Sequence, residues 1–217
     1  GCERQASPGE NQHPTQQEAQ TSTGGTQAPD TQNPPGQSSS VLTVTSHTVN
    51  KELPYEGATL ASMLVSVPQF SGAPAAQQLS AFFMQKAQDA LADGETVFAQ
   101  AQNELAPAVS QGREVMPYSY ALTYEIPRCD LSMLSVLLTY ETSTGGVHPS
   151  ATLKAYNFSC ETGARLTLSD IFTAPEADYL ARIEQLVDKQ AEDRQIALFD
   201  NVKGALTAHF SPEDFYF

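Results

Sequence analysis

The sequence predicts an α+β fold in which antiparallel sheets pack against helices, and in which the folded part forms two associated halves. Three observations support this class. Residues 3–40 contain no Val, Ile, Leu, Met, Phe or Tyr, so the folded part begins near Val41. From there, runs of alternating β-branched residues predict strands, and apolar residues at three- and four-residue spacing predict helices. The strands and helices come in blocks, which is typical of α+β domains and not of parallel βαβ repeats.

Five segments have the alternation and the β-branched or aromatic composition of strands. They are residues 41–50, 59–70, 115–126, 131–141 and 151–159. Pro54 and Gly57 indicate a turn between the first two, and Pro68 is expected to stop the second. The pair Gly145 and Gly146 predicts that the last two strands form a hairpin.

Four segments are predicted to be helical because one side of each is apolar. They are residues 75–91, a second helix from about Glu95 that is interrupted near Pro107, residues 175–194 as the longest helix, and residues 196–209. The third is expected to turn Tyr179, Ile183, Leu186 and Val187 inward. A short turn after residues 166–168 is expected to be capped by Ser169 or Asp170. Residues 215–217 resemble the opening of one more strand.

The N-terminal segment predicts an exported, lipid-anchored chain. Gln, Thr, Ser, Pro and Gly dominate residues 3–40, and such a segment cannot bury enough apolar surface to order itself. Bacterial lipoproteins are cleaved before a cysteine whose thiol then carries diacylglycerol. Cys2, directly ahead of this tether, is therefore the expected lipidation site, with the signal peptide removed. Residues 1–40 are then anchor and tether, on the outer face of the cell membrane.

The charge of the folded part limits its partners. From residue 41 onward there are ten basic and 21 acidic residues, a net charge of −11. This excess of acid argues against nucleic acid, whose phosphates need a basic surface. It permits a cationic partner, although solubility alone is the simpler explanation. No apolar run is long enough to span a membrane, so contact with the membrane is expected through the lipid anchor only.

No motif for catalysis, for a cofactor or for a metal is present, so neither enzymatic activity nor a cofactor is expected. The four histidines lack the spacing of metal ligands. The best candidate for ligand binding is the hairpin loop that contains Gly145, Gly146 and His148, together with Tyr140 and Tyr156. Two alternatives stay open. The loop residues can simply form the turn, and the tyrosines of three neighbouring strands can simply stabilise the sheet.

Cys129 and Cys160 are predicted to lie at the open end of the hairpin, close to opposite one another. Exported proteins fold under oxidising conditions, so a disulfide between them is possible. A slip of one residue in register would send the two side chains to opposite faces and prevent it. The sequence leaves both outcomes open.

Four motifs resemble those of a known family of exported domains. They are YETSTGGVH at residues 140–148, AYNF at 155–158, ETG at 161–163 and LTLSDIF at 166–172. The family is a two-part domain of unknown function found in Gram-positive lipoproteins. It also forms the ectodomain of a lysozyme-sensing anti-sigma factor and the non-catalytic N-terminal part of some peptidoglycan deacetylases.

The resemblance implies an α+β fold, with an N-terminal half over residues 41–140 and a C-terminal half over residues 141–217. It also implies an extracytoplasmic location, and it does not imply catalysis. Members of the family usually continue with further strands, so the C-terminal half is expected to be truncated. The expected function is a cell-envelope module that binds or senses a cationic, lysozyme-like protein or the wall glycan, peptidoglycan. The alternatives are a cell-wall hydrolase or esterase and a purely structural lipoprotein.

Overall fold

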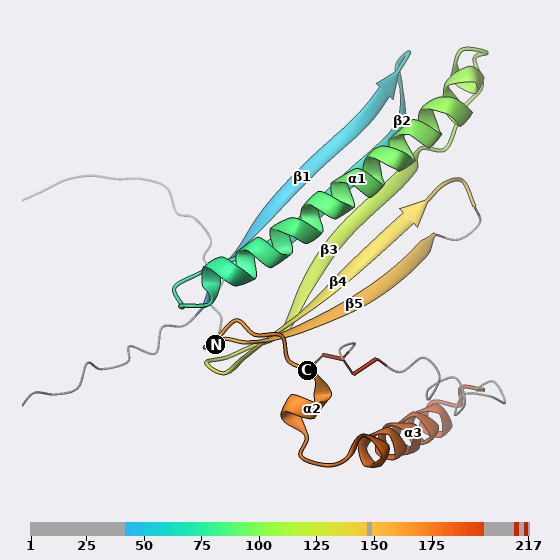
Figure 1. Ribbon diagram of the computed structural model, residues 1–217. Helices are drawn as coiled ribbons and strands as arrows, with labels where there is room; N and C mark the ends of the chain where they lie inside the picture. The colour runs from blue at the N-terminus through green and yellow to red at the C-terminus, as the bar shows by residue number, and fades with distance from the viewer. Residues whose placement is uncertain (1–41, 147–148, 198–210, 213–214, 217) are drawn as a thin grey trace, which may run out of the picture.

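The computed structural model describes residues 42–146, 149–197, 211–212 and 215–216. In this part of the chain five strands form one sheet in the order β1-β2-β3-β4-β5, and a long helix, α1, lies across one face of it (Figure 1). Neighbouring strands are antiparallel except for β2 and β3, which run parallel on either side of the α1 crossover. The predicted α+β class is confirmed.

The first two strands form a hairpin. β1 spans Thr43–Tyr55 and β2 spans Ala58–Ser71, with only Glu56 and Gly57 between them. Both turn residues have positive φ, 47° and 84°, as a type I′ turn requires. Gly57 adopts this conformation without strain, so the turn predicted at Gly57 is confirmed. Pro54 is not part of it: β1 extends past the predicted end at residue 50, and Pro54 pairs with Thr59 of β2.

Pro68 does not end β2, contrary to the sequence-based expectation. The strand continues to Ser71, and Pro68 pairs in register with Ser46 of β1. The other side of β2 pairs with β3 only from Ala61 to Val65. At Pro68 this side of β2 is therefore a sheet edge, where a missing backbone N–H costs no ladder hydrogen bond.

The two helices predicted between residues 75 and 107 are one helix, α1, which spans Ala76–Val109. Its buried side continues without a break through the predicted gap, at Leu79, Phe83, Ala87, Ala90, Gly94, Val97, Phe98 and Ala101. Gly94 lies inside this helix, and a Cβ there would lie 2.4 Å from Cε of Met63 on β2, so the close packing of α1 on β2 favours glycine at this position. Pro107 is tolerated because it lies in the last turn, where few intrahelical bonds remain to be lost.

The last three strands form an antiparallel meander. β3 spans Tyr118–Cys129, β4 spans Met133–Ser143 and β5 spans Ser150–Ser159. The predicted hairpin of β4 and β5 is confirmed by a continuous register from Met133↔Ser159 to Thr142↔Ser150. The expected boundary between two halves at residues 140 and 141 lies inside β4, so one sheet includes both sides of it.

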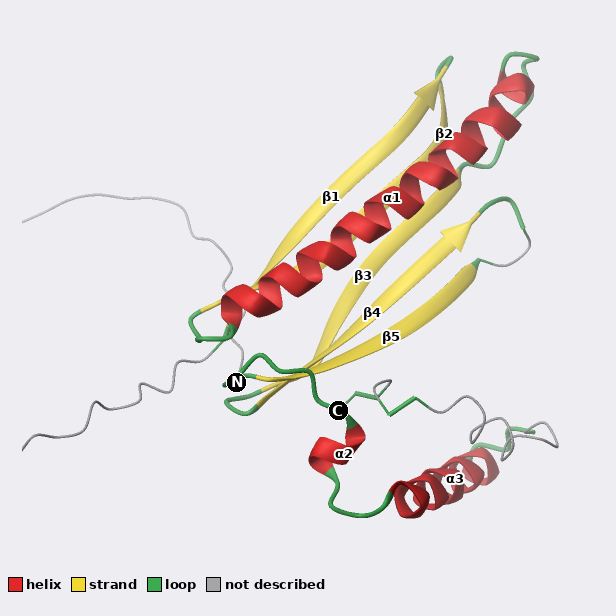
Figure 2. Ribbon diagram, viewed as in Figure 1, coloured by secondary structure: helices red, strands yellow, loops and turns green. Residues whose placement is uncertain are grey.

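The chain after β5 forms two helices that lie beyond this strand and apart from α1 (Figure 2). α2 spans Leu168–Ile171, and its N-cap is Thr167, not Ser169 or Asp170. Thr167 and Asp170 form a reciprocal capping box, in which each side chain caps the backbone near the other residue.

α3 spans Glu176–Asp193 and is shorter than α1, so the prediction that it is the longest helix is wrong. Of its expected inward side chains, Tyr179 is buried but Leu186 is 43% exposed. Most of the helix predicted at residues 196–209 lies outside the described residues. Phe215 and Tyr216 are not in a strand, although the Phe215 carbonyl accepts a hydrogen bond from the buried Asn157 side chain.

Candidate functional site

Four tyrosines lie on the face of the sheet that α1 occupies. Tyr118 and Tyr120 are on β3, Tyr140 is on β4 and Tyr156 is on β5. Side chains alternate between the two faces of a strand, and the register places Leu122 opposite Tyr140, and Val136 opposite Tyr156, on this same face. α1 packs mainly on β2 and β3, and β4 and β5 lie beyond β3 to one side of the helix (Figure 1). The tyrosines of β3, β4 and β5 therefore follow this flank of α1.

The flank of α1 beside these tyrosines carries carboxylates. Asp93 follows Asp89 by four residues, and Glu104 follows Asp93 by eleven. Both spacings place side chains on the same side of a helix. We call the four tyrosines and three carboxylates the tyrosine–carboxylate strip.

One end of the strip is held by hydrogen bonds. The Tyr118 hydroxyl donates to Oε2 of Glu104 at 2.5 Å, and Gln100 Nε2 donates to Oε1 of the same carboxylate at 3.1 Å. These two donors lower the pKa of Glu104, and the bond to Glu104 raises the pKa of Tyr118. A Cβ on Gly145 would lie 3.3 Å from the Tyr118 ring, so this glycine of the β4–β5 loop packs closely on the strip.

The centre of the strip contains hydroxyls that are desolvated but weakly bonded. Tyr120 is only 5% exposed, and its hydroxyl is 3.5 Å from Oδ2 of Asp93. Burial, followed by the nearby Asp93 charge, raises the pKa of Tyr120 to about 12. Burial also raises the pKa of Tyr140, with smaller contributions from Tyr156, Tyr120, Asp89 and Asp93. In the described part of the chain no group forms a hydrogen bond with the Tyr140 hydroxyl.

The other end of the strip contains two cations of the protein itself. The Arg165 guanidinium carbon lies 4.4 Å from the centre of the Tyr156 ring. Lys86 Nζ lies 5.9 Å from the same ring and 5.5 Å from the Phe82 ring. Lys86 is also 4.0 Å from Asp89. At this end the aromatic faces of the strip therefore already bind positive charge.

The structure brings only part of the predicted binding set together. Tyr140 and Tyr156 lie in the strip, Gly145 packs at its Tyr118 end, Gly146 is exposed in the loop, and His148 lies outside the described residues. The three carboxylates were missed because they are in the middle of a helix, far from the tyrosines in sequence. Their helical spacing was the only signal that pointed to a common flank.

The possible disulfide between Cys129 and Cys160 is absent, because Cys160 is a free, buried thiol. Cys129 ends β3 and Cys160 follows β5, and β4 lies between these strands. Two interstrand spacings amount to about 9–10 Å, whereas a disulfide needs Cα atoms within about 7 Å. Burial raises the pKa of the Cys160 thiol to about 11, so it is protonated at neutral pH.

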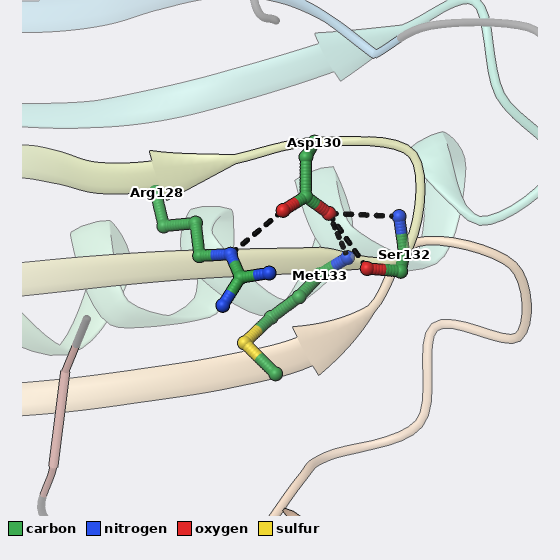
Figure 3. Close-up of polar contacts among 4 residues, drawn as sticks. All are labelled: Arg128, Asp130, Ser132 and Met133. Atoms are coloured by element: carbon green, nitrogen blue, oxygen red, sulfur yellow. Dashed lines mark hydrogen bonds and ion pairs between the residues drawn. The ribbon is translucent and has the colours of Figure 1, made fainter.

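A second polar cluster closes the turn between β3 and β4 (Figure 3). One oxygen of Asp130 accepts hydrogen bonds from the backbone N–H groups of Ser132 and Met133 and from the Ser132 hydroxyl, at 2.7–2.9 Å. The other oxygen bonds Arg128 Nε at 2.7 Å. These donors hold the pKa of Asp130 far below its usual value. The cluster stabilises the turn, because the donors that bind the Asp130 carboxylate all come from the turn or from the strand ends beside it.

We expect Asp130→Asn to lower the free energy of unfolding at pH 7 by about 1–2 kcal/mol, a modest value because the carboxylate is partly exposed and screened. The folded pKa lies below the unfolded value, so this stabilisation is present above about pH 4 and is lost as the pH falls. Urea titrations at pH 7 and at low pH measure the effect. Glu52→Gln, at an exposed position of β1, serves as the control. A difference that does not shrink in acid would contradict the assignment.

Elsewhere, two surface hollows are present among the described residues. One, of about 450 Å³, lies between the β1–β2 turn and the chain after α1, and its charged lining residues are Glu56, Arg113 and Glu114. The other, of about 650 Å³, lies where β2 leads into α1 and has no charged lining residue. No group of three metal-ligating side chains occurs within the described ranges. No helix there is long and apolar enough to cross a membrane. The strip is thus the best-defined candidate site.

The fold and the strip together define a class: a single-sheet α+β domain whose long helix carries exposed carboxylates beside a row of buried and half-buried tyrosines. No protein-family model matches the sequence, and no curated protein matches it. Among solved structures, a DUF3298 family member from Bacteroides fragilis is similar, with a TM-score of 0.55 and 16% sequence identity. The match covers 77% of this chain and 74% of that chain.

A DUF3298 family protein from Pseudomonas aeruginosa also matches, with a TM-score of 0.45 and 13% identity, over 70% of this chain and 68% of that chain. At such low identities the comparison concerns the fold alone. This chain is therefore similar in fold to a domain of unknown function, as the motif resemblance implied.

Proposed function

We propose that this chain is a lipid-anchored binding module of the cell envelope, and that its partner is a cationic wall-active protein of the lysozyme type. The tyrosine–carboxylate strip is the observation that carries the proposal. Asp93 and Glu104 are exposed, and neither is ion-paired with a lysine or arginine among the described residues. A basic partner would supply the missing counter-charges.

The chemistry of the strip supports recognition. Tyr140 and Tyr156 are half-buried, and a tyrosine provides large, rigid contact area at a low cost in conformational entropy. The net charge of −11 beyond residue 40 would speed the approach of a basic protein. The resemblance of the motifs to a lysozyme-sensing ectodomain points to the same kind of partner.

We further propose that the module binds without catalysis. General acid–base catalysis needs groups whose pKa values lie near the working pH. In the strip the pKa shifts go the other way: those of Tyr118, Tyr120 and Tyr140 are raised and that of Glu104 is lowered. All four groups then keep one protonation state at neutral pH. An incubation with peptidoglycan and with a chromogenic ester is expected to release no product, and turnover would support the hydrolase alternative.

The lipid anchor is proposed on Cys2, which lies outside the described residues. In bacteria, the chain with its signal peptide is expected to fractionate with membranes, and Cys2→Ser is expected to leave most of it unanchored, because one thiol carries the diacylglycerol. Immunoblots of detergent-phase and aqueous fractions measure the change. Ser7→Ala is the control in the same tether. Equal partition of Cys2→Ser and the unaltered chain would refute the anchor.

Binding is expected when the protein is titrated with lysozyme in a calorimeter, and the affinity should be roughly tenfold weaker at physiological than at low salt, because opposite charges are screened. Cytochrome c, an equally basic protein that does not act on cell walls, is the control. No heat with lysozyme at either salt concentration would exclude this partner. Equal binding of both proteins would reduce the effect to unspecific charge attraction.

A further inference from the structure

At one end of the strip, cationic side chains of the protein itself lie over an aromatic ring. At Tyr156 the Arg165 guanidinium stacks at 4.4 Å from the ring centre, and Lys86 lies over the same ring and over Phe82. Planar guanidinium groups bind tyrosine faces by cation–π attraction and by stacking. One end of the strip therefore has its positive charge supplied from within the chain.

The centre of the strip also combines tyrosine rings with carboxylates, but no lysine or arginine of the described residues lies over these rings. The Tyr120 hydroxyl is 3.5 Å from Oδ2 of Asp93, and the charges of Asp89 and Asp93 both contribute to the raised pKa of Tyr140. Asp93 is ion-paired with no basic residue in the described ranges, and the Tyr140 hydroxyl has no hydrogen-bond partner there. Asp89 is only partly neutralised, since Lys86 is 4.0 Å away.

We propose that the strip centre, formed by Tyr120, Tyr140, Asp89 and Asp93, binds an arginine side chain of the basic partner. This inference rests on the proposed function and names the chemical group that the site recognises. The guanidinium would stack on the Tyr140 ring and donate hydrogen bonds from its N–H groups to the Asp93 carboxylate.

Arginine fits better than lysine for two reasons. Its planar fork has five donors, enough for the oxygens of Asp89 and Asp93 at once, whereas an ammonium is a compact point charge. Arginine is also more weakly hydrated, so it costs less to bring against a half-buried ring such as Tyr140. Within the protein itself, the cation nearest to the Tyr156 ring is also an arginine, Arg165.

The test uses short peptides as probes, because they separate the site from the identity of the partner. Hexa-arginine, hexa-lysine and hexa-citrulline are titrated against the full chain, with amide chemical shifts as the readout. Hexa-arginine is expected to bind at least about fivefold more tightly than hexa-lysine, because of bidentate and stacking contacts. Hexa-citrulline, which has the same shape without the charge, is expected not to bind.

Two variants locate the contact. Asp93→Asn is expected to weaken hexa-arginine binding about fivefold or more, since a charge-assisted bond is lost. Glu95→Gln is the matched control: it removes the same charge two residues away, from a carboxylate that pairs with Lys51 of β1, and should change affinity less than about twofold. Tyr140→Leu should weaken binding more than Tyr140→Phe, because the ring is the stacking surface.

The outcomes separate the two proposals. Equal effects of Asp93→Asn and Glu95→Gln, or equal affinity for arginine and lysine peptides, would overturn the arginine site. If lysozyme binds and Asp93→Asn does not weaken it, the proposed function stands and this inference fails. If neither lysozyme nor any peptide binds, both fail.

Discussion

Replacing Phe83 by alanine is expected to lower the free energy of unfolding by about 3–5 kcal/mol, the usual cost of removing a buried aromatic ring. Phe83 of α1 is fully buried, and its ring centre lies 5.9 Å from that of Phe70 on β2 and 5.9 Å from that of Phe158 on β5. One side chain thus joins the helix to strands on both sides of the sheet centre. The cavity would form where β2, β5 and α1 meet, and these elements cannot all close around it.

Chemical denaturation followed by circular dichroism measures this loss against a total stability of about 5–15 kcal/mol for a typical domain. Leu153→Ala is the control, because Leu153 on β5 is 55% exposed and should cost less than about 0.5 kcal/mol. A loss below about 1 kcal/mol for Phe83→Ala would mean that the packing of α1 on β5 is wrong.

Gly94→Val is expected to cost about 2–3 kcal/mol, because it overpacks the contact between α1 and β2. A Cβ at this position would lie 2.4 Å from Cε, 2.8 Å from Sδ and 3.0 Å from Cγ of Met63. Met63 is 2% exposed, so its side chain has little free space into which to move. The clash outweighs the roughly 1 kcal/mol that a helix gains when glycine is replaced by a better helix former.

Met63→Ala provides the decisive control for this contact. On its own it should destabilise the protein by about 2–3 kcal/mol, as a buried methionine truncation does. Combined with Gly94→Val it should cost clearly less than the sum of the two single changes, since the valine fills the vacated space. Additive effects would show that residues 63 and 94 do not touch.

Local patterns determined much of this protein. The β4–β5 hairpin, the β1–β2 turn and the α+β class follow from two-residue alternation and from turn residues, and these act over a few neighbours in the chain. The excess of acid and the polar composition of residues 3–40 were likewise evident without a structure. Where the local rules conflicted, the prediction was wrong: a helix break between residues 91 and 95 and a strand end at Pro68 were predicted, yet both elements continue.

Tertiary structure decided the rest, because it depends on which elements become neighbours. A glycine that weakens an isolated helix is retained in α1 since Met63 occupies the space beside it, and a proline is tolerated in β2 where β3 no longer pairs. The strand order also depends on which elements become neighbours. It places β4 between β3 and β5, and so keeps Cys129 and Cys160 too far apart for a disulfide. The strip draws on α1, β3, β4 and β5. Only the packing of α1 beside the meander places Asp93 next to Tyr120, and no periodicity within one segment encodes that contact.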